Sequence, residues 1–126
     1  MSEIVPGPDV ILYTTDDGRT AIQLRIAEGT VWLTQLELAD LFQTTKQNIS
    51  LHLRNVLGEG ELSEAAVVKE DLTTAADGKR YRTRLYNLEV VLAVGYRVRS
   101  PRGTQFRQWA TERLREYLVK GFVLDD

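Results

Sequence analysis

The sequence predicts an α+β fold, and two observations support that prediction. Segments 10–26 and 67–86 each hold two β-type runs around a turn that contains Asp-Gly. Asp-Gly favours a tight hairpin turn because its glycine accepts positive φ. Between these segments, and again after residue 87, apolar residues recur at the three- and four-residue spacing of helices. With 126 residues, the chain is expected to form one domain over 10–126.

The N-terminal third is predicted to be a β-meander. Residues 1–9 hold two prolines and a glycine and are expected to form a flexible arm. Runs 10–14 and 21–26 are apolar and flank Asp16-Asp17-Gly18, which predicts a hairpin. Glu28-Gly29 then predicts a second turn into a short strand over 30–33.

Two helices are predicted to follow the meander. Thr34 and Glu37 have the spacing of a capping box, in which hydroxyl and carboxylate each accept a bond from a free amide at the helix start. After a polar turn at Thr44-Thr45, Thr45 is expected to cap a second helix over 46–57. The predicted inward face of this helix consists of Ile49, Leu53 and Val56/Leu57.

The second hairpin and two further helices complete the predicted fold. Strands are expected over 67–73 and 80–86, with Asn87 capping a helix over 88–98. Ser100–Gly103 is predicted to break the chain before a final helix over 104–120. The core face of that last helix is predicted to hold Phe106, Trp109, Leu114, Tyr117 and Leu118.

The net charge of −2 conceals a strong separation of charge along the chain. Residues 79–115 hold ten basic and two acidic side chains, a balance of +8, whereas residues 1–78 hold five basic and thirteen acidic ones, a balance of −8. Such asymmetry indicates a polyanion-binding face. Alternatively, the two halves neutralise each other in the folded domain. Both interpretations remain open at this point.

Segment 33–54 has the form of a helix-turn-helix motif, in which the first residues of the second helix enter the major groove. Gln and Asn are able to bond adenine bidentately, Lys reaches guanine, and hydroxyls bond phosphate or base. The alternative is a pair of ordinary core helices. The candidate DNA-contacting residues are Thr45, Lys46, Gln47, Asn48, Ser50 and Arg54.

The basic arm of the second hairpin resembles the wing of a winged helix-turn-helix domain. Because successive side chains of a strand point to opposite faces of the sheet, the arginines at alternate positions of this arm share one face. The candidate backbone contacts are Lys79, Arg80, Arg82 and Arg84. The alternative is that these arginines pair with nearby acids, namely Glu59, Glu61, Glu64, Glu70 and Asp71.

Nothing in the sequence predicts an enzyme. There is no cysteine, and His52 is the only histidine, so no triad or histidine–cysteine metal site is expected. We expect no catalytic residue, metal or cofactor. No apolar run has the roughly 20 residues of a membrane span, and no signal peptide begins the chain, so a cytoplasmic location without a membrane partner is predicted.

The chain resembles the RhuM-type family of virulence-associated bacterial proteins from about Tyr13 to Asp126. The motifs that carry the resemblance are Val31–Gln35, Thr45–His52, Leu72–Tyr81, Tyr86–Leu88, Gly95–Val98 and Phe106–Ala110. Segment 87–110 is similar, more distantly, to the end of the N-terminal domain of phage antirepressors and baculovirus BRO proteins. That similarity implies phosphate contacts for Arg97, Arg99, Arg102 and Arg107.

The predicted function is therefore sequence-specific binding of double-stranded DNA by a transcription-regulator-like domain. The alternative is a protein-interaction module of an antirepressor or toxin-associated system. The oligomeric state is open: the last helix with the apolar tail 119–124 offers the interface of a homodimer, and the alternative is that it closes the core of a monomer. Members of the RhuM-type family are commonly longer, so two alternatives stay open: the chain is the N-terminal domain of a longer protein, with a C-terminal domain or partner not present here, or it is a naturally short member.

Overall fold

A computed structural model of the chain describes residues 10–59, 62–74 and 77–116. In this part of the chain, five strands form one antiparallel sheet in the order β1-β2-β3-β5-β4, so the predicted α+β class is confirmed. The predictions on the arm 1–9, on Tyr117 and Leu118, and on the tail 119–124 lie outside the described residues. The strands are β1 (Val10–Thr14), β2 (Ala21–Ala27), β3 (Thr30–Thr34), β4 (Val68–Thr74) and β5 (Arg80–Asn87).

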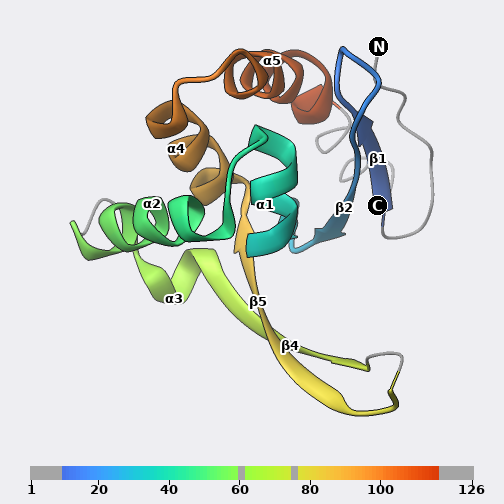
Figure 1. Ribbon diagram of the computed structural model, residues 1–126, viewed down its shortest axis with the longest axis vertical. Coiled ribbons are helices and arrows are strands. Elements are labelled where there is room, and N and C mark those ends of the chain that lie inside the picture. Colours follow the sequence, from blue (N-terminus) through green and yellow to red (C-terminus); the bar gives the residue numbers. More distant parts are fainter. Residues whose placement is uncertain (1–9, 60–61, 75–76, 117–126) are drawn as a thin grey trace.

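The helices in the described residues are α1 (Gln35–Phe42), α2 (Lys46–Gly58), α3 (Glu64–Val67), α4 (Leu88–Val98) and α5 (Pro101–Trp109). A stretch of π-helix, η1 (Ala110–Leu114), continues α5. Figure 1 shows α5 at one end of the molecule and the tip of the β4–β5 hairpin at the other. None of the helices in these ranges is both long enough and apolar enough to cross a membrane.

The sheet joins the two predicted β segments through its centre. Strands β1 and β2 pair around a turn where Gly18 has φ of 72°, and Gly29 has φ of 76° in the next turn. Strand β3 pairs with β5, with Trp32 opposite Asn87, and β4 pairs with β5 along its whole length. The N-terminal meander and the basic hairpin therefore belong to one sheet.

Local hydrogen bonds confirm the predicted helix starts. The Thr34 hydroxyl accepts a bond from the Glu37 amide at 3.1 Å, and Glu37 accepts one from the Thr34 amide at 2.8 Å. Thr45 and Asn87 cap α2 and α4 in the same way, through the amides of Asn48 and Val90. The short helix α3 was not predicted, because four residues are too few to show a helical period.

Helix α5 begins earlier than the sequence analysis expected. Residues 100–103 were predicted as a break, yet Ser100 caps the helix and Pro101 occupies its first turn. Proline suits that position because its missing N–H has no intrahelical partner there. Gly103 faces α4 at close range: a Cβ placed on it would lie 2.8 Å from the carbonyl oxygen of Gly95. The glycine thus marks a helix crossing and not a helix end.

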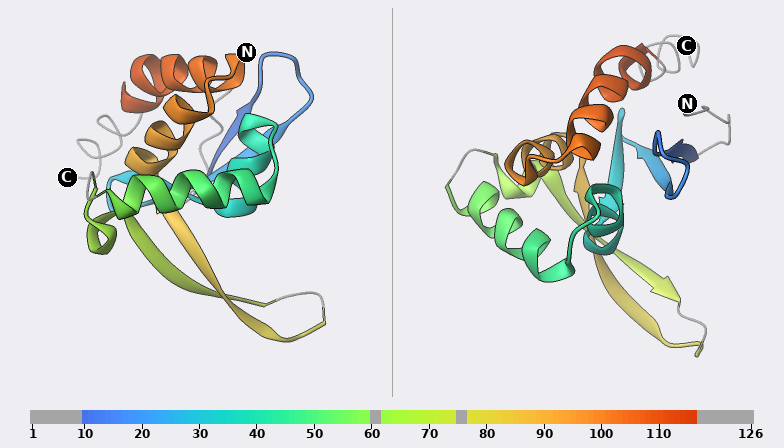
Figure 2. Two further views of the ribbon diagram at one scale, coloured as in Figure 1. Left: turned by 60° about the vertical axis from the view of Figure 1, so that its left-hand side comes forward. Right: turned by 45° about the horizontal axis from the view of Figure 1, so that its top comes forward.

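One hydrophobic core joins the sheet to the helices. The predicted inward residues Ile49, Leu53 and Val56 are all buried. Phe106 and Trp109 are core residues, as predicted, and their rings pack against Tyr13 with centroid distances of 5.2 and 4.7 Å. Burial raises the pKa of Tyr13 to about 12. Helices α4 and α5 close the core on the side away from the hairpin tip (Figure 2).

Candidate nucleic-acid interface

Helix α2 has a buried stripe on one side and an exposed ridge on the opposite side. Its buried stripe, Ile49, Leu53 and Val56, fixes the orientation of the helix. At 100° per residue, the opposite side forms a ridge of Gln47, Leu51 and Arg54, all of them exposed. Leu51 was not among the predicted contacts, although its four-residue spacing from Gln47 places it on the same ridge. Its side chain is 49% exposed.

The connection between α1 and α2 is short and held by side chains. Gln43 ends α1 in the left-handed conformation with φ of 53°, and the Thr44 amide donates to the Ala39 carbonyl at 2.9 Å. The Asn48 side-chain amide donates to the Thr44 hydroxyl at 2.9 Å, so part of its bonding capacity is used within the turn. The side chains of Lys46 and Gln47 are exposed at the start of α2, and Thr45 is exposed as well, although its hydroxyl accepts the capping bond from the Asn48 amide.

A groove joins α2 to the base of the hairpin. Its volume is about 370 Å³, and its lining includes Ser50 and Arg54 from α2 together with Arg84 and Tyr86 from β5. Gln35 lies at the same groove and donates from its side chain to the Lys46 carbonyl at 3.0 Å. Two of the predicted surfaces, the second helix and the basic strand, therefore share one concave face.

Among the described residues of the hairpin, the cations near its base have acidic partners and those nearer its tip have no ion pair. Arg84 bonds Glu64, and Arg82 lies 3.9 Å from Glu70. Lys79 and Arg80 are exposed, and neither side chain has an ion pair within the described residues. In Figures 1 and 2 this end of the hairpin extends well beyond the body of the domain. Arg80 and Lys79 are thus the hairpin cations freest to meet a polyanion.

Arg102 does not belong to the interface, which corrects the expectation that it contacts phosphate. Its side chain is buried and donates to Thr20 Oγ1 and the Asp40 carbonyl at 3.0 Å each, and to Asp17 Oδ2 at 2.9 Å. Bonds from Thr15, the Arg19 amide and Arg102 hold the pKa of Asp17 well below its usual range. Arg102 therefore ties the β1–β2 turn to α1 and α5.

Arg97 and Arg99 lie at the end of α4, beside the flank of α2 that faces away from the hairpin. Arg97 pairs with Glu59 at 2.7 Å, and Arg99 ends α4 in the left-handed conformation with φ of 55°. Both line a groove that also contains His52 and Asn55. His52 is half-buried there.

The charge separation of the sequence is partly cancelled in the fold. Within the described residues, arginines from the basic half pair with acids from the acidic half, as in Arg82–Glu70, Arg84–Glu64, Arg97–Glu59 and Arg102–Asp17. The neutralisation interpretation is confirmed for these arginines. Cations without an ion pair in the described part of the chain include Lys46, Arg54, Lys79, Arg80, Arg99 and Arg107.

These features define an α+β domain with an exposed helix beside a basic hairpin. Residues 66–126, a little under half of the chain, match the model of the virulence protein RhuM family. The family resemblance is confirmed over this segment, which includes β4, β5, α4 and α5 but not α1 and α2. No similar protein was found among curated proteins or among solved structures.

Proposed function

We propose that this domain binds double-stranded DNA, with the start of α2 in the major groove and the β4–β5 hairpin along the backbone. The observation that carries the proposal is the shared groove in which Ser50 and Arg54 of α2 lie beside Arg84 of β5. A protein that reads a groove while holding the adjacent backbone needs its helix and its basic strand on one face.

The order of the elements supports this assignment. Strand β3, helices α1 and α2, and hairpin β4–β5 follow one another, with β3 paired to β5. This is the order that a winged helix-turn-helix domain requires, with α2 as recognition helix and the hairpin as wing. The tight turn at Gln43 and Thr44 sets the angle between the two helices.

The exposed chemistry of α2 suits base recognition. Gln47 has both a donor and an acceptor for an adenine edge, and Lys46 is able to reach guanine acceptors. Leu51 adds an apolar group of the kind that contacts the thymine methyl. The exposed helix start presents free amides and the positive dipole end to a phosphate. Arg54 extends the same ridge by nearly two turns.

A selection experiment tests the proposal. The full chain is incubated with a pool of random duplexes at low salt, and the bound fraction is sequenced. We expect an enriched motif, and the double variant Lys46→Ala, Gln47→Ala is expected to bind that motif about tenfold to a hundredfold more weakly. The matched control is Thr111→Ala, Arg113→Ala, which removes an exposed polar and a basic side chain from η1 and is expected to leave the affinity unchanged.

Two results contradict the proposal. One is an absence of duplex binding by the wild-type chain at low salt, which would favour a protein-interaction role. The other is an unchanged motif affinity in the Lys46, Gln47 variant, which would remove α2 from the recognition surface.

A further inference from the structure

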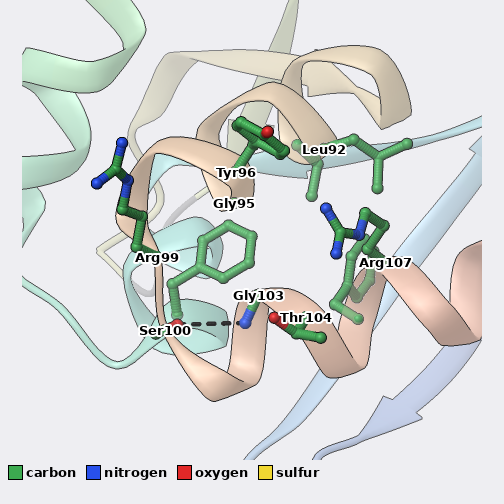
Figure 3. A pocket seen from close by; sticks show the side chains of 11 residues that line it. Leu92, Gly95, Tyr96, Arg99, Ser100, Gly103, Thr104 and Arg107 are labelled. Atoms are coloured by element: carbon green, nitrogen blue, oxygen red, sulfur yellow. Dashed lines mark hydrogen bonds between the residues drawn. The ribbon is translucent and has the colours of Figure 1, made fainter.

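A second concave site lies on the flank of α2 that faces away from the hairpin. A groove of about 920 Å³ runs between α2, α4 and α5. It adjoins a pocket of about 410 Å³ between α4 and α5, which Figure 3 shows from close by. Both spaces are lined by Leu92, Tyr96, Arg99 and Arg107. Spaces of a few hundred Å³ have the size of small-molecule sites.

The pocket combines an apolar floor with a cationic rim. Phe42, Val91 and Phe106 line it and are buried, whereas Arg99 and Arg107 are exposed at its edge. Neither arginine has an ion pair within the described residues, and the lining of both spaces contains no acid. An apolar surface beside two uncompensated guanidinium groups favours a ligand with a flat ring and an anionic group.

Tyr96 supplies an exposed aromatic face at the rim. Its side chain is 70% exposed, the highest value for a large apolar or aromatic residue in the described chain. The Arg107 guanidinium lies 5.8 Å from the centroid of the Tyr96 ring. Figure 3 shows Tyr96 on α4 across the opening from Gly103 and Thr104 on α5. An exposed ring next to a guanidinium group is a stacking platform of the kind that binds nucleobases.

Close packing of the two helices fixes the walls of the pocket. A Cβ on Gly95 would lie 2.8 Å from Cζ of Phe42, and a Cβ on Gly103 would lie 2.8 Å from the Gly95 carbonyl oxygen. The helices thus meet at two glycines, and the Ser100 hydroxyl accepts a bond from the Gly103 amide at 3.2 Å. A site with rigid walls loses little ordering entropy when a ligand binds.

We propose that this pocket binds a small nucleoside phosphate, with the base stacked on Tyr96 and the phosphate held by Arg99 and Arg107. The site is separate from the proposed DNA surface. Gln47 and Arg54 form the exposed ridge of α2, and the groove with Ser50 and with Arg84 of β5 lies on the flank of α2 opposite the pocket. The adjoining groove shares Tyr96, Arg99 and Arg107 with the pocket and reaches α2 at His52 and Asn55.

Isothermal titration calorimetry of the full chain tests the proposal. The probes are the common ribonucleoside mono- and triphosphates, with adenosine, inorganic phosphate and a single-stranded oligonucleotide as comparisons. We expect saturable one-to-one binding of at least one nucleoside phosphate, and at least tenfold weaker binding of adenosine and of inorganic phosphate. Tyr96→Ala and the double variant Arg99→Gln, Arg107→Gln are each expected to weaken that binding by about tenfold or more.

The controls separate this site from the DNA surface. Tyr81→Ala and Arg113→Gln remove an exposed tyrosine and an exposed arginine elsewhere and are expected to leave nucleotide affinity unchanged. Circular dichroism confirms that each variant is folded. The proposal is overturned if no nucleoside phosphate binds at millimolar concentration, if only the oligonucleotide binds, or if the Tyr96 and arginine variants bind as wild type does. None of these outcomes depends on duplex binding, which the α2 variants test independently.

Discussion

The substitution Arg102→Ala is predicted to destabilise the domain without removing a DNA contact. The guanidinium makes three bonds, to Thr20, to the Asp40 carbonyl and to Asp17. Asp17 is exposed, so the bond to Asp17 is not counted in the expected loss of stability. Each bond from a charged donor contributes about 1.5 to 3 kcal/mol when its partners are buried. Since the bonds to Thr20 and to the Asp40 carbonyl are only partly buried, we expect a loss of about 2 to 4 kcal/mol in the free energy of unfolding.

Urea unfolding followed by circular dichroism measures this loss. For a domain of this size, a loss of this magnitude corresponds to a fall in Tm of roughly 10 °C. The matched control is Arg107→Ala on the same helix, where the side chain is exposed and its one contact given by the described residues is with the Tyr96 ring. That control is expected to change the stability by less than about 0.5 kcal/mol.

A double-mutant cycle separates the Asp17 contact from the other two. Asp17→Ala alone is expected to cost less than Arg102→Ala, because it leaves the bonds to Thr20 and to the Asp40 carbonyl in place. Equal stability of the Arg102 and Arg107 variants would refute the reasoning. So would a folded Arg102→Ala domain whose stability is unchanged but whose duplex affinity is lost.

Three further predictions concern stability. Gly103→Ala is expected to lower the free energy of unfolding by about 1 to 3 kcal/mol, because its Cβ would meet the Gly95 backbone at 2.8 Å; a stability at or above wild type would show that the helices separate freely. The pKa of Asp17 is lowered in the fold, so the ionised carboxylate stabilises the domain above the usual carboxyl pKa near 4, and this stabilisation is lost as the pH falls below that value. In Asp17→Asn, the urea midpoint is expected to lose this part of its dependence on acid pH. The same dependence of the urea midpoint on pH in the variant and in wild type would contradict the assignment. Thr34→Ala removes the capping hydroxyl and is expected to cost about 1 kcal/mol in thermal or urea unfolding, whereas no change would mean that the capping box contributes nothing.

Features set by neighbouring residues were predictable from the sequence. The capping box at Thr34 and Glu37, the Thr45 cap and the glycine turns depend on residues within four positions of one another. The buried stripe of α2 follows from its helical period. The pairing of β3 with β5 was not predicted, because it joins segments separated by three helices and a hairpin strand.

The role of Arg102 was beyond local reasoning. Its partner Asp17 lies 85 residues earlier in the chain, and sequence patterns do not reveal such a contact. The start of α5 was misplaced because Pro101 and Gly103 were interpreted as breakers. Both residues have other roles in the fold: proline begins the helix, and the glycine allows α4 to approach.

The candidate interface was predicted in part. The helical period placed Gln47 and Arg54 on the exposed side of α2, yet Leu51 on the same ridge was overlooked. The sequence also left open how many arginines pair with acids. Only the fold shows that Glu64 engages Arg84 while Arg80 has no ion pair among the described residues, because that choice depends on distances between side chains.

The salt dependence of duplex binding tests the central claim most directly. Log affinity measured against log salt concentration is expected to fall with a slope of about −4, as for a protein that neutralises four or five phosphates. The double variant Lys79→Ala, Arg80→Ala, at the two hairpin cations without an ion pair in the described residues, should make the slope shallower by about two, one for each lost phosphate contact. Duplex binding that is absent at low salt, or a slope that this variant leaves unchanged, would contradict the proposed DNA surface.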